Sequence, residues 1–319
     1  MLARGSATDA PDAMAAHIAQ ACRTVRDDIW NFGTSHISWP LTGTRRRIPL
    51  TLTPDDEPGS GRPTAITTTA TLAGTALPRR LSWQLGRVVE LVDETARTMN
   101  IVLDVPDWQG HRAGQHVDVR LTAEDGYQAE RSYSIASAPE DRHLVLTVER
   151  LRDGEVSPYL TDVLMPGDEL ELRGPIGGYF IWEESLGGPL LLIAGGSGVA
   201  PFRAMLRHWS AVRSAVPTRL LYSSRSLDDL IYRGELLDGA YDGVEVRVAL
   251  TRQWPDDWRG HRGRMHGELL QQVAWVPSER PLVYICGPTG FVEAAAQSLV
   301  GQGHDPRRVR TERFGPTGT

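Results

Sequence analysis

Two short motifs in this sequence combine residue types that suit phosphate binding. Arg131-Ser-Tyr-Ser134 puts a cation, an aromatic ring and two hydroxyl groups on one short stretch, which suits a flavin and its pyrophosphate. Gly195-Gly-Ser-Gly-Val-Ala-Pro201 follows the apolar run at 189–194. An apolar strand that breaks into a glycine turn and then a helix offers its backbone N–H groups to a phosphate. The two motifs therefore predict a flavin site and a phosphate-binding loop on one chain.

Two further motifs support this pair. Gly154-Glu-Val-Ser157 opens a short predicted helix, where backbone N–H groups and a hydroxyl could meet an anion. Gly-x-x-Ser is also a common turn. Cys286-Gly-Pro-Thr-Gly290 follows another apolar stretch, and its cysteine is interpreted either as part of a ligand site or as a small buried residue that ends a strand.

The first motif falls among short segments that are rich in β-branched residues and separated by turn signals. Strands are expected at 82–92, 98–105, 116–121, 129–136, 144–150 and 169–173, and one short helix at 157–164. Six such strands fit a small closed antiparallel barrel.

Beyond residue 184 the pattern becomes an alternation of strand and helix. Apolar strands are expected at 189–194, 219–223, 244–250, 281–286 and 309–314. Helical faces are expected from Phe202 to Val212, around Leu270, and from Phe291 to Leu299. This alternation predicts a parallel sheet covered on both faces. Ligands of such sheets bind at the carboxyl ends of the strands, where Gly195, Ser224, Cys286 and Phe314 fall.

Taken in this order, the motifs resemble the ferredoxin–NADP reductase superfamily, in which a flavin barrel precedes a nicotinamide-binding domain. Pro201 stands where the dehydrogenase fingerprint has its third glycine, which matches this superfamily rather than ordinary Rossmann dehydrogenases. The resemblance covers about residues 81–314. It implies an FAD-binding FR-type barrel at 79–184 and an NAD(P)-binding α/β domain at 185–319. The extension at 1–78 is expected to be disordered or partly helical, with a helix predicted at 12–30.

The resemblance assigns the flavin contacts to the barrel. In the superfamily the arginine of the first motif pairs with a flavin phosphate, its tyrosine packs beside the flavin, and its last serine hydrogen-bonds near the ring nitrogen that accepts hydride. These roles fall to Arg131, Tyr133 and Ser134. The further flavin contacts implied are Ser132, Val148, Glu149, Gly154, Val156 and Ser157.

The nicotinamide contacts are implied for the second domain. They are Gly195, Gly196, Ser197, Gly198, Pro201, Cys286, Gly287 and Pro288. Cys286 is implied to position the nicotinamide against the flavin rather than to act as a nucleophile. Glu312 and Phe314 would bring an acid and an aromatic ring to the same face of the flavin. The catalytic residues expected are therefore Ser134, Cys286 and Glu312, and no metal is expected.

The choice between the two nicotinamide cofactors depends on the second parallel strand. It ends Tyr222-Ser-Ser-Arg225, without the carboxylate that NAD-selective sites usually place there. Ser224 and Arg225 suit a 2′-phosphate and favour NADPH, whereas Asp228 and Asp229 would favour NADH if they turned inward. FAD is the expected flavin, and FMN stays an alternative because no adenine-stacking residue is evident.

Composition excludes several classes of protein. The 319 residues carry a net charge of −6, which argues against a nucleic-acid partner. No stretch approaches the ~18 apolar residues of a membrane span, and no secretory signal is recognisable, so a cytoplasmic protein is expected. Two cysteines, Cys22 and Cys286, are too few for a plant-type ferredoxin cluster.

The resemblance implies a flavin-dependent NAD(P)H oxidoreductase, because a flavin accepts two electrons as hydride and can release them singly. The acceptor would then be a separate ferredoxin-like protein, an oxygenase component or a haem protein. Two alternatives stay open. One is a non-catalytic, flavin-bearing electron-transfer subunit of a larger complex, and the other is a reductase of free flavin.

Overall fold

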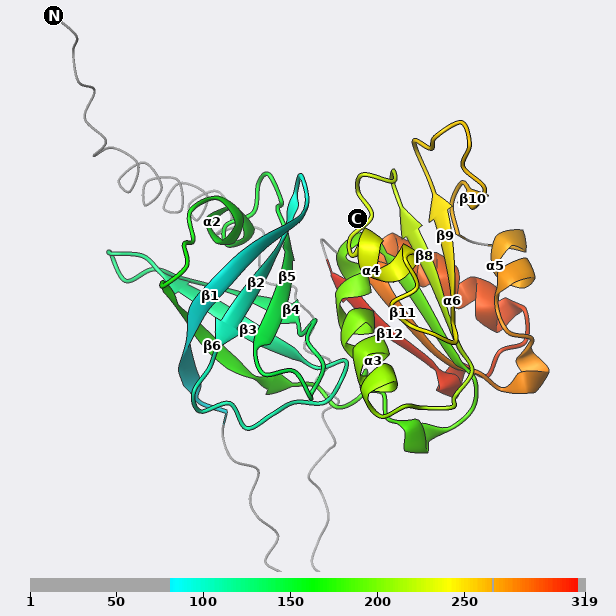
Figure 1. Cartoon of the computed structure of the whole chain (residues 1–319), viewed down its shortest axis with the longest axis horizontal. Helices are drawn as coiled ribbons and strands as arrows, with labels where there is room; N and C mark the ends of the chain where they lie inside the picture. The colour runs from blue at the N-terminus through cyan, green and yellow to red at the C-terminus, as the bar shows by residue number, and fades with distance from the viewer. Residues whose placement is uncertain (1–80, 266, 315–319) are drawn as a thin grey trace, which may run out of the picture. The chain divides into compact units, whose positions relative to one another are not determined.

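The structure is a computed structural model that describes residues 81–265 and 267–314. The extension expected at 1–78, with its predicted helix at 12–30, lies outside the described residues, as does Cys22. Within the described ranges, no helix has the length and apolar character needed to cross a membrane. The described part of the chain forms two six-stranded sheets, one antiparallel and one parallel (Figure 1).

The first sheet is the expected antiparallel barrel, with strand order β4-β3-β6-β1-β2-β5. Its strands are β1 (Trp83–Thr95), β2 (Thr98–Asp104), β3 (His116–Thr122), β4 (Gln128–Ser134), β5 (Leu144–Glu149) and β6 (Glu169–Ile176). A bridge between Ile135 and Leu146 joins the two edges, β4 and β5, and so closes the sheet. Inward-facing residues such as Ile101, Leu146 and Leu172 are fully buried and form the barrel core.

The second sheet is wholly parallel, with strand order β10-β9-β8-β7-β11-β12. Its strands are β7 (Leu190–Gly195), β8 (Thr218–Ser224), β9 (Val244–Leu250), β10 (His261–Arg262), β11 (Leu282–Pro288) and β12 (Val309–Phe314). The chain runs from β7 through β8 to β9 and then returns to β11 on the other side of β7. This reversal leaves a crevice at the carboxyl ends of β7 and β11, the usual ligand site of such sheets.

Helices cover both faces of the parallel sheet, as the sequence predicts. On one face, Leu190 and Leu192 of β7 pack in the same cluster as Phe202 and Met205 of α3 (Ala200–Ala211). On the other face, Leu191 of β7 packs with residues of α5 (Glu268–Val273) and α6 (Thr289–Gly301). Consecutive residues of β7 therefore face opposite cores, and an uninterrupted apolar run is required.

The structure differs from the predicted elements at their ends and in their shortest members. α3 stops at Ala211, so Val212 lies beyond it and is 42% exposed instead of joining the helical face. The five-residue α4 (Arg233–Leu237) and the two-residue β10 were not predicted, because elements this short carry too few residues for a recognisable period. α2 (Ser157–Asp162) ends two residues earlier than expected.

A buried polar cluster joins the barrel to the α/β domain. The Glu94 carboxylate accepts hydrogen bonds from Asn100 Nδ2 (2.6 Å) and from the backbone N–H of Tyr232 (3.0 Å). The Tyr232 hydroxyl reaches Asn100 Oδ1 (3.1 Å) and also bonds the Thr147 hydroxyl. Tyr232 adopts a left-handed backbone conformation (φ 60°) that presents both groups to the barrel. These four residues are called the interdomain cluster below.

Candidate functional site

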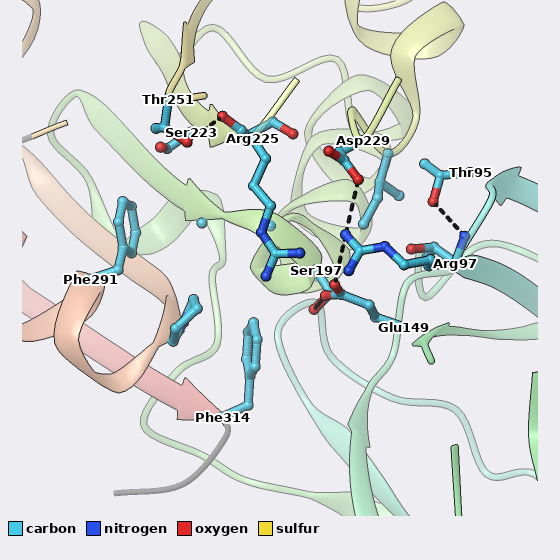
Figure 2. Close-up of a pocket in the computed structure, with 16 residues that line it drawn as sticks. Thr95, Arg97, Glu149, Ser197, Ser223, Arg225, Asp229, Thr251, Phe291 and Phe314 are labelled. Carbon is cyan, nitrogen blue, oxygen red and sulfur yellow. Dashed lines mark hydrogen bonds and ion pairs between the residues drawn. The ribbon is translucent and has the colours of Figure 1, made fainter. Parts of the chain in front are cut away.

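A pocket lies at the carboxyl ends of β7, β8, β11 and β12, and barrel residues form part of its wall (Figure 2). Many of the predicted cofactor-binding residues line it: Glu149, Gly195, Gly196, Ser197, Ser224, Arg225, Pro288 and Phe314. The fold therefore brings strand ends that are far apart in the chain to one opening. Gly198, Pro201, Cys286 and Gly287 lie behind this surface rather than on it.

The glycine loop, Gly195–Val199, begins at the last residue of β7 and leads through a short 3₁₀ turn into α3. Gly196 has a φ of +56°, which favours glycine. A Cβ on Gly198 would lie 2.2 Å from the carbonyl oxygen of Cys286 and 2.7 Å from the nitrogen of Gly287. The loop thus lies directly against the Cys286-Gly-Pro motif of β11, and no side chain fits between the two segments.

Two polar groups at the end of β8 are without partners among the described residues. The Ser224 hydroxyl is buried and makes no hydrogen bond there. Arg225 is exposed, and its guanidinium extends over the pocket towards Phe314 without an ion-pair partner in that part of the chain (Figure 2). An unsatisfied buried polar group costs about 1–3 kcal/mol, so the Ser224 hydroxyl favours a ligand that supplies a hydrogen-bond partner, and the exposed Arg225 beside it offers a positive charge to the same ligand.

Asp229 lines the same pocket, but its negative charge is already paired with other side chains. Its carboxylate accepts hydrogen bonds from Ser226 Oγ (2.7 Å) and from Arg97 Nη2 (2.9 Å). Burial alone would raise the pKa of Asp229, but these bonds and the nearby charges of Arg97 and Arg225 hold that pKa below its ordinary value. Asp228 is exposed and is not part of the pocket wall.

Cys286 and Glu312 stand side by side, in register on β11 and β12. Burial, and then the charge of Glu312, raise the pKa of the Cys286 thiol, which is therefore neutral. Burial also raises the pKa of Glu312 to about 7. One carboxylate oxygen of Glu312 lies 3.8 Å from His116 Nδ1, while the other is buried without a hydrogen-bond partner among the described residues.

His116 connects this pair to the barrel motif, because it stands opposite Ser134 in the β3–β4 ladder. Burial lowers the pKa of His116, so the imidazole offers Glu312 no positive charge at neutral pH. The three residues expected to be catalytic therefore belong to one row of neighbouring residues. Ser134 lies beside His116, His116 beside Glu312, and Glu312 beside Cys286.

The remaining barrel residues have protein partners in this structure. Arg131 Nη2 donates to Glu155 Oε2 (2.5 Å), and the Ser132 hydroxyl donates to Asp118 (2.6 Å). Tyr133 is half-buried and packs on the barrel core. Val148 is fully buried in that core, and Val156 is buried beside it.

The Gly-x-x-Ser motif forms the expected turn before α2, and its glycine and serine lie close together. The Ser157 hydroxyl accepts a hydrogen bond from the backbone N–H of Leu151 (3.0 Å). A Cβ on Gly154 would lie 2.9 Å from that hydroxyl oxygen, so the turn favours glycine at this position.

Several pocket residues were not predicted from the sequence. Thr95, Arg97 and Thr98 come from the β1–β2 hairpin of the barrel, and Ile231, Thr251 and Phe291 come from the α/β domain. The Phe291 ring packs against Gly195, where a Cβ would lie 2.8 Å from it. Nothing in the local sequence indicates that a charged hairpin residue such as Arg97 lines a pocket. Phe291 could have been predicted as a pocket residue, because it is an aromatic residue that follows the Cys286-Gly-Pro motif closely.

Two family descriptions match the chain: the Oxidoreductase FAD-binding domain at residues 87–181 and the Oxidoreductase NAD-binding domain at residues 192–297. Ferredoxin–NADP reductase B of Sorangium cellulosum is 35% identical over 210 residues, which cover 63% of this chain and 84% of that protein. The glycine betaine monooxygenase reductase subunit of Pseudomonas aeruginosa is 32% identical over 239 residues. This match covers 73% of this chain but only 64% of that longer protein.

Solved structures give the same picture. The FAD/NAD-binding domain of nitric oxide dioxygenase from Vibrio cholerae has a TM-score of 0.65 at 27% identity, covering 73% of this chain and 99% of that one. The Amycolatopsis cytochrome P450 reductase has a TM-score of 0.66 at 27% identity, covering 75% of this chain and 71% of that one.

Proposed function

Because this chain belongs to the ferredoxin–NADP reductase superfamily, we propose that it passes electrons from NAD(P)H through FAD to a separate protein acceptor. The observation that carries this proposal is the convergence of the glycine loop, Cys286 and Glu312 at the switch point of the parallel sheet. The domain limits 79–184 and 185–319 belong to the same proposal, and the two family matches lie inside them.

The residues present fit a flavin between the barrel motif and the end of β12. Arg131, which pairs with Glu155, is 43% exposed at the barrel surface, and one oxygen of Glu312 is buried without a partner in the described ranges. Arg131, Tyr133 and Ser134 would hold the flavin, which when bound takes up two electrons and releases them one at a time.

The chain's own residues would orient the nicotinamide donor, and one of them can hold or release a proton. The glycine loop supplies backbone N–H groups for the dinucleotide phosphates, and the buried, neutral Cys286 thiol leaves a close, uncharged surface beside it. Glu312, with a pKa near 7, can hold or release a proton at neutral pH within this water-poor region.

An oxygenase component is the acceptor class that we favour, with a ferredoxin-like or haem protein next. The support is that the similar proteins include reductase subunits of glycine betaine monooxygenase and of an aromatic O-demethylase. A cytoplasmic location belongs to the same proposal, and the support is that Cys286 is a free cysteine, as is usual in a reducing compartment.

An absorbance spectrum of the purified protein, followed by titration with NADH and NADPH, tests the proposal. We expect a yellow protein that holds one flavin per chain and is bleached by either or both donors. A colourless protein that takes up no flavin would contradict it. Flavin that stays bound but is not reduced would instead support the non-catalytic subunit.

Arg225→Ala is expected to lower kcat/KM for NADPH by about 5- to 150-fold and to change that for NADH much less. The reason is that a charge-assisted contact to the 2′-phosphate contributes roughly 1–3 kcal/mol, and Arg225 has no partner among the described residues that would compete. Steady-state kinetics with both donors measure the ratio. Arg142→Ala, an exposed arginine outside the pocket, is the control. If the wild type prefers NADH, and Arg225→Ala does not change the ratio of kcat/KM for the two donors, Arg225 is only a surface charge.

Glu312→Gln is expected to flatten the dependence of stability on pH. The folded protein holds a proton on Glu312 between about pH 4.5 and 7 that the unfolded chain has released, so wild-type stability falls as the pH rises through this window. At pH 8 the glutamine variant should be more stable by up to about 3 kcal/mol. Thermal melts at pH 5 to 8 test this, with the exposed Glu90→Gln as control. Parallel curves for wild type and Glu312→Gln would refute it.

A further inference from the structure

A carboxylate of the barrel lies on the loop that is proposed to receive the dinucleotide phosphates. The Ser197 hydroxyl donates a hydrogen bond to Glu149 Oε2 (2.8 Å). The same oxygen lies 3.9 Å from the position that a Cβ on Gly196 would take. Glu149 is the last residue of β5, so the barrel itself supplies an anion to the glycine loop (Figure 2).

An arginine stands within reach on the other side of this carboxylate. Arg97, in the β1–β2 turn, has its Nη2 atom 3.7 Å from Glu149 Oε1 and 2.9 Å from Asp229 Oδ1. The two oxygens of Glu149 therefore face different partners, one the serine of the loop and the other the guanidinium. The Arg97 carbonyl accepts a hydrogen bond from the backbone N–H of Arg150 (2.7 Å), which holds the turn beside the end of β5.

A dinucleotide pyrophosphate carries two negative charges and would need the same Ser197 hydroxyl and loop backbone. Two like charges cannot share this position without strong repulsion, so Glu149 must leave the loop when the phosphates arrive. A small rotation of its side chain towards Arg97 would take the carboxylate off Ser197 and keep it paired.

We propose that Glu149 competes with the dinucleotide phosphates for the glycine loop, and that Arg97 receives the Glu149 carboxylate when the dinucleotide binds. The two barrel residues then set the affinity of the loop for its substrate, although neither belongs to the nucleotide-binding motif. This inference rests on the proposed function, since it concerns the same site.

Binding of NADP⁺ and NAD⁺ to the flavin-loaded protein, measured by titration calorimetry, tests the inference without turnover. Glu149→Gln, which keeps the shape but removes the charge, should lower the dissociation constant for NADP⁺ by about 5- to 50-fold. In kinetics the KM for NADPH should fall in parallel with the dissociation constant, because binding that is equal in the ground state and the transition state is what changes. Glu90→Gln removes an equal charge outside the pocket and should change neither value.

Glu149→Asp distinguishes the effect of the direct contact between the carboxylate and Ser197 from the effect of long-range repulsion between the carboxylate and the phosphates. It keeps the full charge but is one methylene shorter, so it reaches Ser197 less well and should also tighten NADP⁺ binding. Arg97→Gln should weaken binding in the wild type by about 5- to 10-fold, and clearly less in the Glu149→Gln background, because no carboxylate then needs a new partner.

Inorganic pyrophosphate is the second probe, because it tests the loop without the nicotinamide or adenine. It should bind more tightly to Glu149→Gln than to wild type. Unchanged or weaker NADP⁺ binding in both Glu149→Gln and Glu149→Asp would overturn the inference. A wild type that binds neither NAD⁺ nor NADP⁺ would overturn the proposed function instead.

Discussion

Gly198→Ala is expected to lower kcat/KM for NAD(P)H by about 100-fold or more. The added methyl group would meet the backbone of Cys286 at 2.2 Å, and backbone atoms cannot turn aside as a flexible side chain can. The glycine loop and the Cys286 motif would have to separate, and a displacement of about 1 Å at a reacting site costs about two orders of magnitude in rate. Overpacking of this kind also destabilises by roughly 1–3 kcal/mol.

Stopped-flow reduction of the bound flavin and a thermal melt together measure this effect. Gly301→Ala is the matched control, because Gly301 ends α6 with open space around its Cβ position and an ordinary helical backbone. It should leave reduction unchanged and the melting temperature equal or slightly higher. Normal reduction by the Gly198→Ala protein would show that the two segments do not need their close contact.

Arg131→Ala is expected to weaken flavin binding by about 10- to 150-fold, so that the protein loses most of its colour on dilution. A charge-assisted hydrogen bond from the planar guanidinium to a phosphate contributes roughly 1.5–3 kcal/mol, and alanine offers no substitute. Arg131 pairs with Glu155 in this structure, so the arginine is held at the barrel surface by a side chain that is only 7% exposed.

The ratio of flavin absorbance to protein absorbance, followed through gel filtration, measures the loss. Glu155→Gln is the informative companion, because it keeps Arg131 while removing the carboxylate that now holds it. That variant should bind flavin at least as tightly as wild type. If Arg131→Ala keeps one flavin per chain with an unchanged dissociation constant, the assignment of Arg131 to the flavin phosphate is wrong.

The architecture could be predicted from the sequence because both sheets have clear local patterns. The apolar run through Leu190–Gly195 has to face two cores, and the structure places its residues alternately in both. The glycine loop was recognisable for a similar reason, since a Cβ at Gly198 would lie 2.2 Å from the backbone of Cys286 and only glycine fits there. These features are written in consecutive residues, and they need no knowledge of distant contacts.

The polar lining of the pocket could not be predicted in the same way. Arg97 and Asp229 are ordinary charged residues of two loops, and their ion pair exists only because the barrel and the parallel sheet meet there. Glu149 was expected as a flavin contact, whereas its side chain hydrogen-bonds Ser197 of the glycine loop. Side-chain partners that are separated by dozens of residues leave no mark on local sequence.

The interdomain cluster limits how this protein could be recombined with its relatives. Glu94 and Asn100 belong to the barrel, but two of the four hydrogen bonds that their side chains make within the described residues come from Tyr232 of the other domain. A chimera that joined this barrel to a foreign nucleotide-binding domain without that tyrosine would leave buried polar groups without hydrogen-bond partners. Each such group costs about 1–3 kcal/mol of stability. The two halves are therefore not interchangeable modules: a successful exchange has to carry Tyr232 and its left-handed turn along with the barrel.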